Sequence, residues 1–346
     1  MNGKVTLKEI SQMAQVSPST VSRVINDYPN VSQAVRERVM TAVRETGYQP
    51  NPAARSLALG KSQVFGLIIP KSAASVCADP FFSYVIQGVA AACKAYDYVL
   101  SLVLFHTIQD ESRSVGRILS QQMLDGVIMT ATQRDNQSVY QLLDSGIPFV
   151  LIGQHDSDQV SFVDSDNQAG AYTAVTHLIR MGYQRIAAIT GPLNNLAAVQ
   201  RKQGYLQALA DRDHQLDEAM VAEGDFTEVS GYTAMRKLLP QRPDAVFISS
   251  DLMAQGALRA IYQEGLSVPD DVALVGYDDL PPAAQTNPPL TTIRQPIKRA
   301  GQTAVETLID LLAHGSEPPR RIILPTELVI RQSCSATRPL IREVMH

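Results

Sequence analysis

Short apolar runs alternate with helical patterns from residue 64 onward, and this alternation constrains the fold more than any other feature. The first series has helical patterns at 82–95 and 111–122 and apolar runs at 64–69, 99–105, 126–129 and 149–152. The second has helical patterns at 169–181, 196–212, 230–239 and 253–264 and apolar runs at 185–189, 245–248 and 272–277. Strand–helix alternation produces parallel sheets with flanking helices. The sequence therefore predicts an α/β fold with two lobes.

The end of the chain is expected to cross back between these lobes, with a helix at 297–313 and strands near Ile322 and Leu328. The predicted first lobe comprises residues 62–163 and about 292–325, and the second comprises 164–291 and about 326–340. Two such lobes form a cleft at the carboxyl ends of their strands, where ligands bind in open α/β sheets. A ligand-binding body is therefore expected.

Residues 1–49 have a different pattern, that of three short helices. Thr6 and Glu9 form a capping box that starts the first helix. The apolar positions of this helix are Leu7, Ile10, Met13 and Ala14. Ser17 starts a second helix over residues 18–26, and a third is expected over residues 32–46. Two short helices joined by a tight turn predict a helix-turn-helix head.

The second helix has a polar face that can read DNA. Its inward positions are Val21, Val24 and Ile25, and its outward positions are Ser19, Thr20, Ser22, Arg23 and Asn26. Arginine can donate two hydrogen bonds to guanine, and hydroxyl groups can reach bases or phosphates. For this helix taken alone, a merely solvated polar face is the alternative.

Residues 50–61 are predicted to form a hinge helix between head and body. Asn51 can cap it, Pro52 suits its first turn, and Gly60 can end it. A helix this short lies below the ~12–15 residues at which isolated helices become marginal in water, so it needs a partner surface. DNA is such a surface, with Arg55 free to meet phosphate. An ordinary interdomain linker is the alternative.

Charge is unevenly distributed along the 346 residues. Residues 1–61 hold eight Lys or Arg and four Asp or Glu, whereas the whole chain has a net charge of −4. A basic head on an acidic body indicates that the head meets a polyanion. There is no run of about 18 apolar residues that would span a membrane, and no signal-peptide core, which predicts a cytoplasmic protein. The three cysteines are far apart in sequence, as is typical of free thiols rather than a metal site.

Together, these motifs resemble a known family. The segments 5–10, 16–26 and 47–51 look like the head of the lactose-repressor/galactose-repressor family of bacterial transcription regulators. Residues 62 to about 335 resemble that family's effector-binding core, which is similar to periplasmic sugar-binding proteins. The segments that carry this second resemblance are 79–82, 166–167, 201–205, 224–226, 250–254 and 276–279.

The resemblance implies how the head would contact DNA. It assigns base reading to Pro18, Ser19 and Arg23, and a minor-groove wedge to Leu57, helped by Ala54. Pro18 departs from the longer polar side chains of some members and would meet a thymine methyl group, since it cannot donate a hydrogen bond. The complete set of predicted DNA-binding residues is Thr6, Ser17, Pro18, Ser19, Thr20, Ser22, Arg23, Asn26, Asn51, Ala54, Arg55 and Leu57.

The resemblance also implies an effector site in the cleft. Phe82 and Phe226 would flank the ligand, and Arg201 and Asp251 would hydrogen-bond it from the second lobe. Such residues suit a sugar, because charged groups pair with hydroxyls and aromatic rings cover the C–H face. The alternatives are ordinary core packing for the two phenylalanines and an internal ion pair for Arg201 with Asp251. After Ile152 the chain reads Gly153-Gln154-His155, where several members have an aspartate, so the identity of the effector stays open.

The sequence therefore predicts a transcriptional repressor that binds a near-palindromic operator as a homodimer and is released by a small-molecule effector, a carbohydrate. We expect no enzyme activity, cofactor or metal, because the chain has no phosphate loop, serine elbow or His/Cys cluster. The alternatives are a corepressor-dependent regulator, for example one that responds to a purine, and a solute-binding protein without a regulatory role. Residues 340–346 are too short for a heptad-repeat tetramerisation tail, which leaves the dimer as the expected state.

Replacing Leu57 with glycine should test the wedge. We expect Leu57→Gly to lower affinity for operator far more than affinity for random DNA, because only a specific complex opens a base step for an apolar side chain. Titration of both duplexes with wild-type and variant protein measures the difference. An equal loss on both duplexes would refute the wedge.

Overall fold

The computed structural model describes residues 5–48, 61–105, 109–120, 123–130, 133, 136–214 and 217–334. The chain divides into two compact units, residues 1–63 and residues 64–346. The predicted hinge residues Asn51, Ala54, Arg55 and Leu57 lie outside the described residues.

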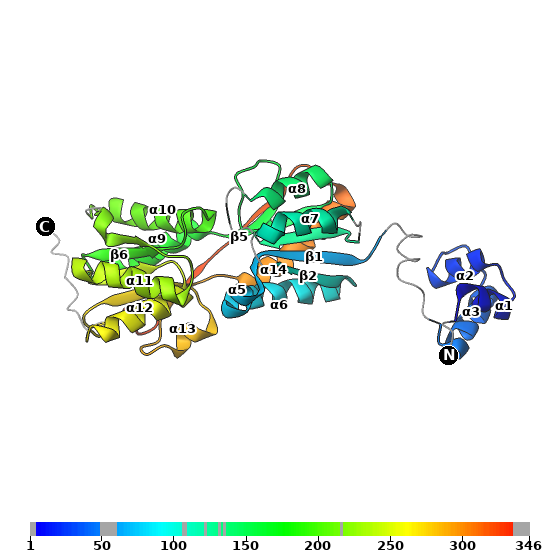
Figure 1. Cartoon of the computed structure of the whole chain (residues 1–346), viewed down its shortest axis with the longest axis horizontal. Coiled ribbons are helices and arrows are strands. Elements are labelled where there is room, and N and C mark those ends of the chain that lie inside the picture. The colour runs from blue at the N-terminus through cyan, green and yellow to red at the C-terminus, as the bar shows by residue number, and fades with distance from the viewer. Residues whose placement is uncertain are drawn as a thin grey trace. The chain divides into compact units, whose positions relative to one another are not determined.

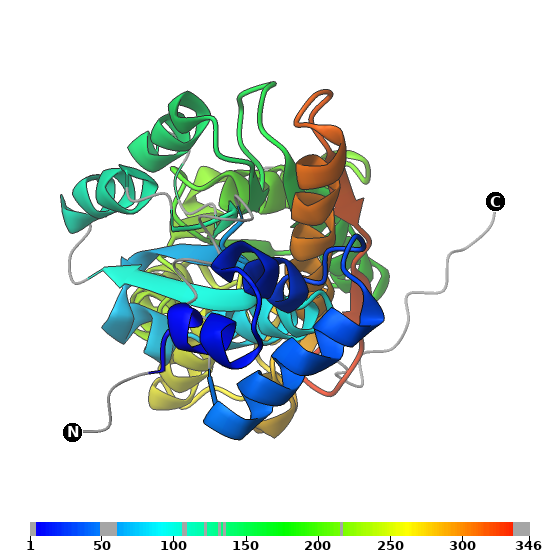
Figure 2. The ribbon, with the colours of Figure 1, turned by 90° about the vertical axis from the view of Figure 1, so that its right-hand side faces the viewer.

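The first unit is a bundle of α1 (Leu7–Met13), α2 (Pro18–Ile25) and α3 (Gln33–Thr46), drawn in blue in Figures 1 and 2. The predicted capping box is confirmed, since Thr6 N donates to Glu9 Oε2 at 2.6 Å and Glu9 N donates to Thr6 Oγ1 at 3.4 Å. The helices share a core of Ile10, Ala14, Val21, Val24, Val39 and Ala42. Met13 does not join this core: it is 51% exposed because it lies outside the α1 face that Ile10 and Ala14 share.

The second unit contains two sheets of six described strands each. The first sheet, in the order β11-β5-β4-β3-β1-β2, belongs to what we call the N-terminal lobe. Its strands are β1 (Val64–Ser72), β2 (Val99–Phe105), β3 (Gly126–Thr130), β4 (Phe149–Ile152), β5 (Phe162–Ser165) and β11 (Arg321–Leu324).

The second sheet, in the order β12-β10-β9-β8-β6-β7, belongs to the C-terminal lobe. Its strands are β6 (Ile186–Thr190), β7 (Val221–Glu223), β8 (Ala245–Ile248), β9 (Ala273–Asp278), β10 (Thr291–Arg294) and β12 (Glu327–Val329). The described strand pairs are parallel except for β10 with β12. The predicted α/β class with two parallel-sheet lobes is therefore confirmed.

Helices cover both faces of each sheet (Figure 1). In the N-terminal lobe, one face carries α6 (Pro80–Ala95) and α14 (Ile297–His314), and the other carries α7 (Gln109–Ser120) and α8 (Gln137–Ser145). In the C-terminal lobe, one face carries α9 (Asn167–Arg180) and α10 (Leu196–Ala210), and the other carries α11 (Glu228–Leu238) and α12 (Asp251–Gln263). The shorter helices are α5 (Ala73–Ala78), α13 (Pro281–Gln285), η1 (Glu218–Met220) and η2 (Leu239–Gln241). No described helix is both long and apolar enough to cross a bilayer.

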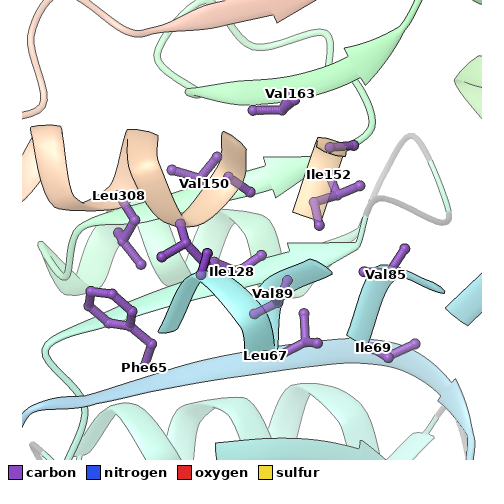
Figure 3. Packing of buried hydrophobic residues seen from close by; sticks show 14 of the residues in the cluster. Phe65, Leu67, Ile69, Val85, Val89, Ile128, Val150, Ile152, Val163 and Leu308 are labelled. Carbon is purple, nitrogen blue, oxygen red and sulfur yellow. The ribbon is translucent and has the colours of Figure 1, made fainter. Parts of the chain in front are cut away.

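The N-terminal core lies between the first sheet and the pair α6 and α14. Phe65, Leu67 and Ile69 project from β1 toward Val89 of α6 and Leu308 of α14 (Figure 3). Residues 65–70 of β1 are all buried, because helices cover the sheet on both sides. This double coverage explains why the strand reads as a continuous apolar run in the sequence.

Three short connections join the lobes. The chain leaves the first sheet at the end of β5 for α9, returns from β10 to α14, and leaves again from β11 to β12. The tail therefore crosses back as predicted. Since the carboxyl ends of β5 and β10 open directly onto crossings, any site between the lobes is built beside these connections.

A glycine at the contact between α6 and α14 gives a test of this packing. A β-carbon at Gly88 would overlap the backbone carbonyl of Lys298, which cannot rotate away. We expect Gly88→Ala to lower the free energy of unfolding by about 1–3 kcal/mol. Gly116 in α7 is the matched control, because a β-carbon there meets nothing within 4 Å. Gly116→Ala should raise the free energy of unfolding by up to about 1 kcal/mol, because alanine favours the helix over glycine. Urea unfolding measures both, and equal effects would contradict the packing argument.

Candidate functional site

The outward face of α2 is the candidate DNA-reading surface. Ser17 caps the helix by accepting a hydrogen bond from Thr20 N at 3.1 Å, and its hydroxyl lies 2.7 Å from that of Ser19. Pro18 occupies the first turn, and Arg23 is exposed in the last turn. This arrangement leaves a cationic side chain and a row of hydroxyls on one solvent-facing surface.

The other predicted head residues surround this surface. Thr20 and Ser22 are half-buried, and Asn26 at the C-terminal cap donates to Ser22 Oγ at 3.3 Å. Thr6 is exposed, but its hydroxyl already belongs to the capping box of α1.

A cavity of about 130 Å³ lies between the lobes of the second unit. It is lined from both lobes and from the crossing after β10, by Lys71, Asp79, Phe81, Phe82, Thr130, Ile152, Gly153, Asp164, Pro192, Asn195, Ala197, Arg201, Phe226, Ser250, Leu252, Asp278 and Gln295. Thr130, Ile152 and Asp278 each end a strand, so the cavity lies at the carboxyl ends of both sheets. This is the place where the topology predicts a ligand.

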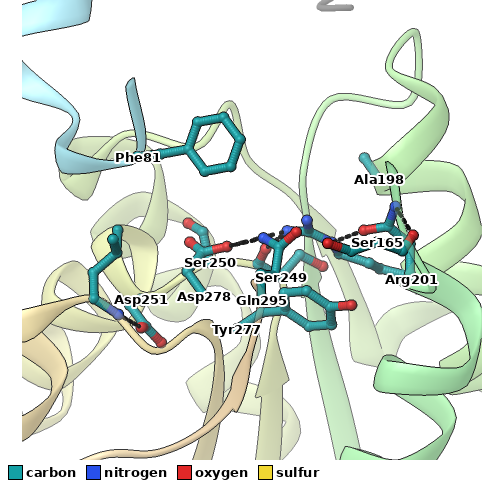
Figure 4. Close-up of polar contacts among 12 residues, drawn as sticks. Phe81, Ser165, Ala198, Arg201, Ser249, Ser250, Asp251, Tyr277, Asp278 and Gln295 are labelled. Carbon is teal, nitrogen blue, oxygen red and sulfur yellow. Dashed lines mark hydrogen bonds and ion pairs between the residues drawn. The ribbon is translucent and has the colours of Figure 1, made fainter. Parts of the chain in front are cut away.

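Arg201 forms the floor of the cavity and is almost completely buried. Its Nε donates to Asn167 Oδ1 at 2.9 Å, and its Nη1 donates to the Ser249 carbonyl oxygen at 2.6 Å. Nη1 also lies 3.7 Å from Asp278 Oδ1, and the guanidinium stacks 3.8 Å from the Tyr277 ring centroid (Figure 4). The guanidinium is thus held in one orientation by partners on three sides.

Three of the four predicted effector residues reach the cavity. Arg201 does so from α10, Phe82 from α6, and Phe226 from the loop after β7. Phe82 also belongs to the N-terminal core, while its neighbour Phe81 projects over the polar floor in Figure 4. Phe82 therefore serves both packing and lining, and Phe81 is an aromatic face that the sequence interpretation missed.

Phe226 depends on a glycine opposite it. Its backbone lies in the left-handed region at φ 70°, which is unusual for an aromatic residue. A β-carbon at Gly191 would overlap the Phe226 ring, so only glycine leaves room for this ring position. The strained backbone and the adjacent glycine place the ring at the cavity wall, consistent with a functional position.

Asp251 is not among the residues that line this cavity, and its contact with the effector stays a prediction. It is 1% exposed, and its carboxylate accepts from Leu280 N at 3.0 Å and from Thr292 Oγ1 at 2.6 Å. These contacts turn its side chain into the C-terminal lobe. The alternative ion pair with Arg201 is also not formed, since Arg201 pairs with Asp278.

Asp278 takes the place at the cavity that the sequence interpretation gave to Asp251. It ends β9, and Gln295 Nε2 donates to its Oδ1 at 2.6 Å. Burial raises the pKa of Asp278 to about 7, against the lowering effect of Arg201. An acid that titrates near neutrality inside a cavity is typical of a binding or catalytic site.

Asp164 is the second acid that sequence interpretation missed. It lies in β5, lines the cavity, and accepts hydrogen bonds from Ser165 N at 2.8 Å and Asn167 Nδ2 at 2.9 Å. Burial raises the pKa of Asp164 to about 6. The available signal was an aspartate inside an otherwise apolar run, Phe162-Val163-Asp164, because a buried strand has little structural need for a carboxylate.

Among the described residues, no group of three His, Cys, Asp or Glu is placed to hold a metal ion. The charged groups of the cavity are instead fixed by hydrogen bonds, and aromatic rings stand beside them. Such a lining binds and orients a polar ligand.

Comparisons with known proteins agree with both parts of the chain. Residues 6–51 match the model of bacterial regulatory proteins of the lacI family, and residues 175–334 match a periplasmic binding protein-like domain. The HTH-type transcriptional regulator CelR of Thermobifida fusca is 38% identical over 333 residues, which cover 95% of this chain and 98% of that protein.

Two solved structures are similar over nearly the whole chain. A complex of the transcriptional regulator CelR with cellobiose has a TM-score of 0.76 at 37% identity, covering 95% of this chain and 99% of that one. The lac repressor dimer bound to operator and the anti-inducer ONPF has a TM-score of 0.83 at 30% identity, covering 96% and 100%. Because this likeness extends over both units, the chain belongs to the LacI family of bacterial transcriptional regulators.

Proposed function

We propose that the chain is a cytoplasmic repressor that binds its operator as a homodimer and is released when a sugar fills the interlobe cavity. The observation that carries this proposal is the buried row of Asp164, Asn167, Arg201, Asp278 and Gln295, which joins the cavity floor to two lobe crossings. A ligand that contacts members of the row would act on side chains that are bonded to both crossings. Binding is thereby linked to the relation between the lobes.

The head supplies sequence reading in this proposal. Arg23 would bond guanine from the exposed side of α2, and Pro18 and Ser19 would meet bases at its N-terminus. Ser17, Thr20, Ser22, Asn26 and Thr6 would fix the head against phosphates and nearby base edges. In a dimer, two heads would read the two halves of a near-palindromic site.

The chemistry of the cavity and the CelR–cellobiose complex among the relatives both support a sugar as the effector. Arg201 and the acids Asp164 and Asp278 provide fixed donors and acceptors for neighbouring hydroxyls. The rings of Phe81 and Phe226 can cover the apolar face of a sugar ring. Asp251 acts behind this surface, by holding the turn at Leu280 against β10.

The hinge, residues 50–61, is proposed as the element that transmits the change. Asn51, Ala54, Arg55 and Leu57 would pack with their symmetry mates in the minor groove only while the two bodies keep one spacing. Effector binding would alter that spacing and release the helix. Coupling of this kind typically amounts to ~1–3 kcal/mol and is reciprocal, so operator would weaken effector binding by the same factor.

Replacing Arg201 tests the link between cavity and operator. We expect Arg201→Met to reduce release by the sugar far more than it reduces effector-free operator affinity, because the variant loses the cation that organises the floor. Lys202→Met, the next position on α10, removes the same charge and should respond like wild type. Fluorescence anisotropy on a selected operator, with cellobiose and other sugars added, measures both.

Two results would contradict this assignment. If the same sugar releases the Arg201→Met variant from the operator as it releases the wild type, then Arg201 does not belong to the effector site. If the sugar tightens operator binding by the wild type, then the sugar acts as a corepressor and not as an inducer. Thermal unfolding of each variant shows that the comparison is made on folded protein.

Stability of the ligand-free protein should depend on pH through Asp164. Its folded pKa of about 6 exceeds the ordinary value near 4, so the folded state binds the proton more tightly. This contribution is complete below about pH 4 and is lost as pH rises through about 6. Asp164→Asn cannot ionise, and over this range its melting temperature should fall ~6–12 °C less than that of wild type, because raising the pKa from about 4 to about 6 contributes about 3 kcal/mol. Scanning calorimetry measures both curves, and parallel curves would contradict the assignment.

A further inference from the structure

Asp164 is a buried carboxylate without a cation of its own. It is 9% exposed, and its hydrogen-bond donors are neutral groups of Ser165, Asn167 and Gln154. Within the part of the chain that the structure describes, no Lys or Arg lies within ion-pair distance of it. Burying a carboxylate in this way is costly, so a ligand that donates to it would recover part of the cost.

The buried cation in the cavity lining is already bonded to other groups. Arg201 donates to Asn167 and the Ser249 carbonyl, pairs with Asp278, and stacks on Tyr277. Its attraction lowers the pKa of Asp164 less than burial raises it. The Asp164 carboxylate therefore lines the cavity with neutral hydrogen-bond donors and without an ion pair of its own.

The remaining charges in the lining do not reverse this balance. Asp79, Asp164 and Asp278 stand against Lys71 and Arg201. Lys71 lies 6.0 Å from the Phe82 ring centroid and is shared electrostatically with Asp79 and with Asp225 of the other lobe. An anionic ligand would therefore meet no excess of positive charge in this lining.

A second observation points to a hydroxyl-rich ligand at the same wall. Thr130 is 2% exposed and lines the cavity, and its hydroxyl has no hydrogen-bond partner among the described residues. Thr130 ends β3 and Asp164 lies near the end of β5, two strands away in the same sheet. An acceptor-only carboxylate and an unsatisfied hydroxyl on the same sheet together match a ligand that carries several hydroxyl groups.

We propose that Asp164 is a specificity-determining residue that makes the cavity select an uncharged polyhydroxyl ligand over its phosphorylated or carboxylated derivatives. The selectivity has two sources. Asp164 accepts hydrogen bonds from neutral hydroxyls, and it repels a phosphate or carboxylate that would occupy the N-terminal wall. The inference rests on the proposed function only in taking this cavity as the effector site.

Binding to the full chain without DNA tests this inference separately from gene regulation. The probes are cellobiose and glucose, each compared with an anionic counterpart, cellobionate and glucose 6-phosphate. By calorimetry at neutral pH, we expect a neutral sugar to bind at least about tenfold more tightly than its anion, as repulsion of ~1.4 kcal/mol would give. Failure of operator release with normal sugar binding would count against the proposed function and leave this inference intact.

Variants assign the selectivity to one carboxylate. Asp164→Asn should narrow the ratio of neutral to anionic affinity by about fivefold or more, because it removes the repelling charge but keeps the shape. Asp158→Asn is the matched control: its side chain is 95% exposed, it carries the same charge, and its variant should leave the ratio unchanged. Asp164→Ser provides the same comparison if the asparagine variant does not fold.

Several results would overturn the inference. One is an anionic sugar that binds the wild type as tightly as its neutral counterpart. Another is a ratio that does not change in the folded Asp164 variants. A third is the absence of binding by both neutral sugars.

Discussion

The buried guanidinium of Arg201 is the interaction on which the body depends. A cation in this environment is tolerated only when each side of it is satisfied. Its direct partners come from α9, the end of β8 and the end of β9, and through Asn167 and Asp278 it reaches Asp164 and Gln295 at two lobe crossings. One charge thereby fixes the relative positions of strand ends that are far apart in sequence. Ligand recognition and the connection between lobes share the same atoms.

Much of the fold could be predicted because strands covered on both faces read as unbroken apolar runs. β1, β3, β4, β8 and β9 have this pattern, and the sequence interpretation found them. It missed β5, whose run is broken by Asp164 and Ser165, and β7 and β10, which are short. It also missed the short helices α5, α8 and α13. Polar residues near the ends of strands weaken the periodic signal at the very positions that build the cavity.

The candidate site was predictable in part. Phe82, Arg201 and Phe226, which the family resemblance indicated, line the cavity. The resemblance did not distinguish Asp251, which begins α12 shortly after β8, from Asp278, which ends β9. The difference between these two aspartates arises from tertiary packing. Gly276 leaves space for Asp251 to approach β9, where Thr292 and the Leu280 amide donate hydrogen bonds to it. No local pattern encodes that approach. The hinge residues lie outside the described chain, so their role stays a prediction.

The three short connections between the lobes have a mechanical consequence. Two short strands, β11 and β12, sit in opposite sheets with only Pro325 and Thr326 between them. Such brief tethers leave little slack for sliding or separation, so the remaining freedom is rotation about the line that they define. A ligand bound beside that axis can therefore have a large effect, because a small rotation of one lobe at the axis produces a large displacement at the end of the lobe farthest from it. Occupancy of the cavity would therefore set the angle between the two lobes.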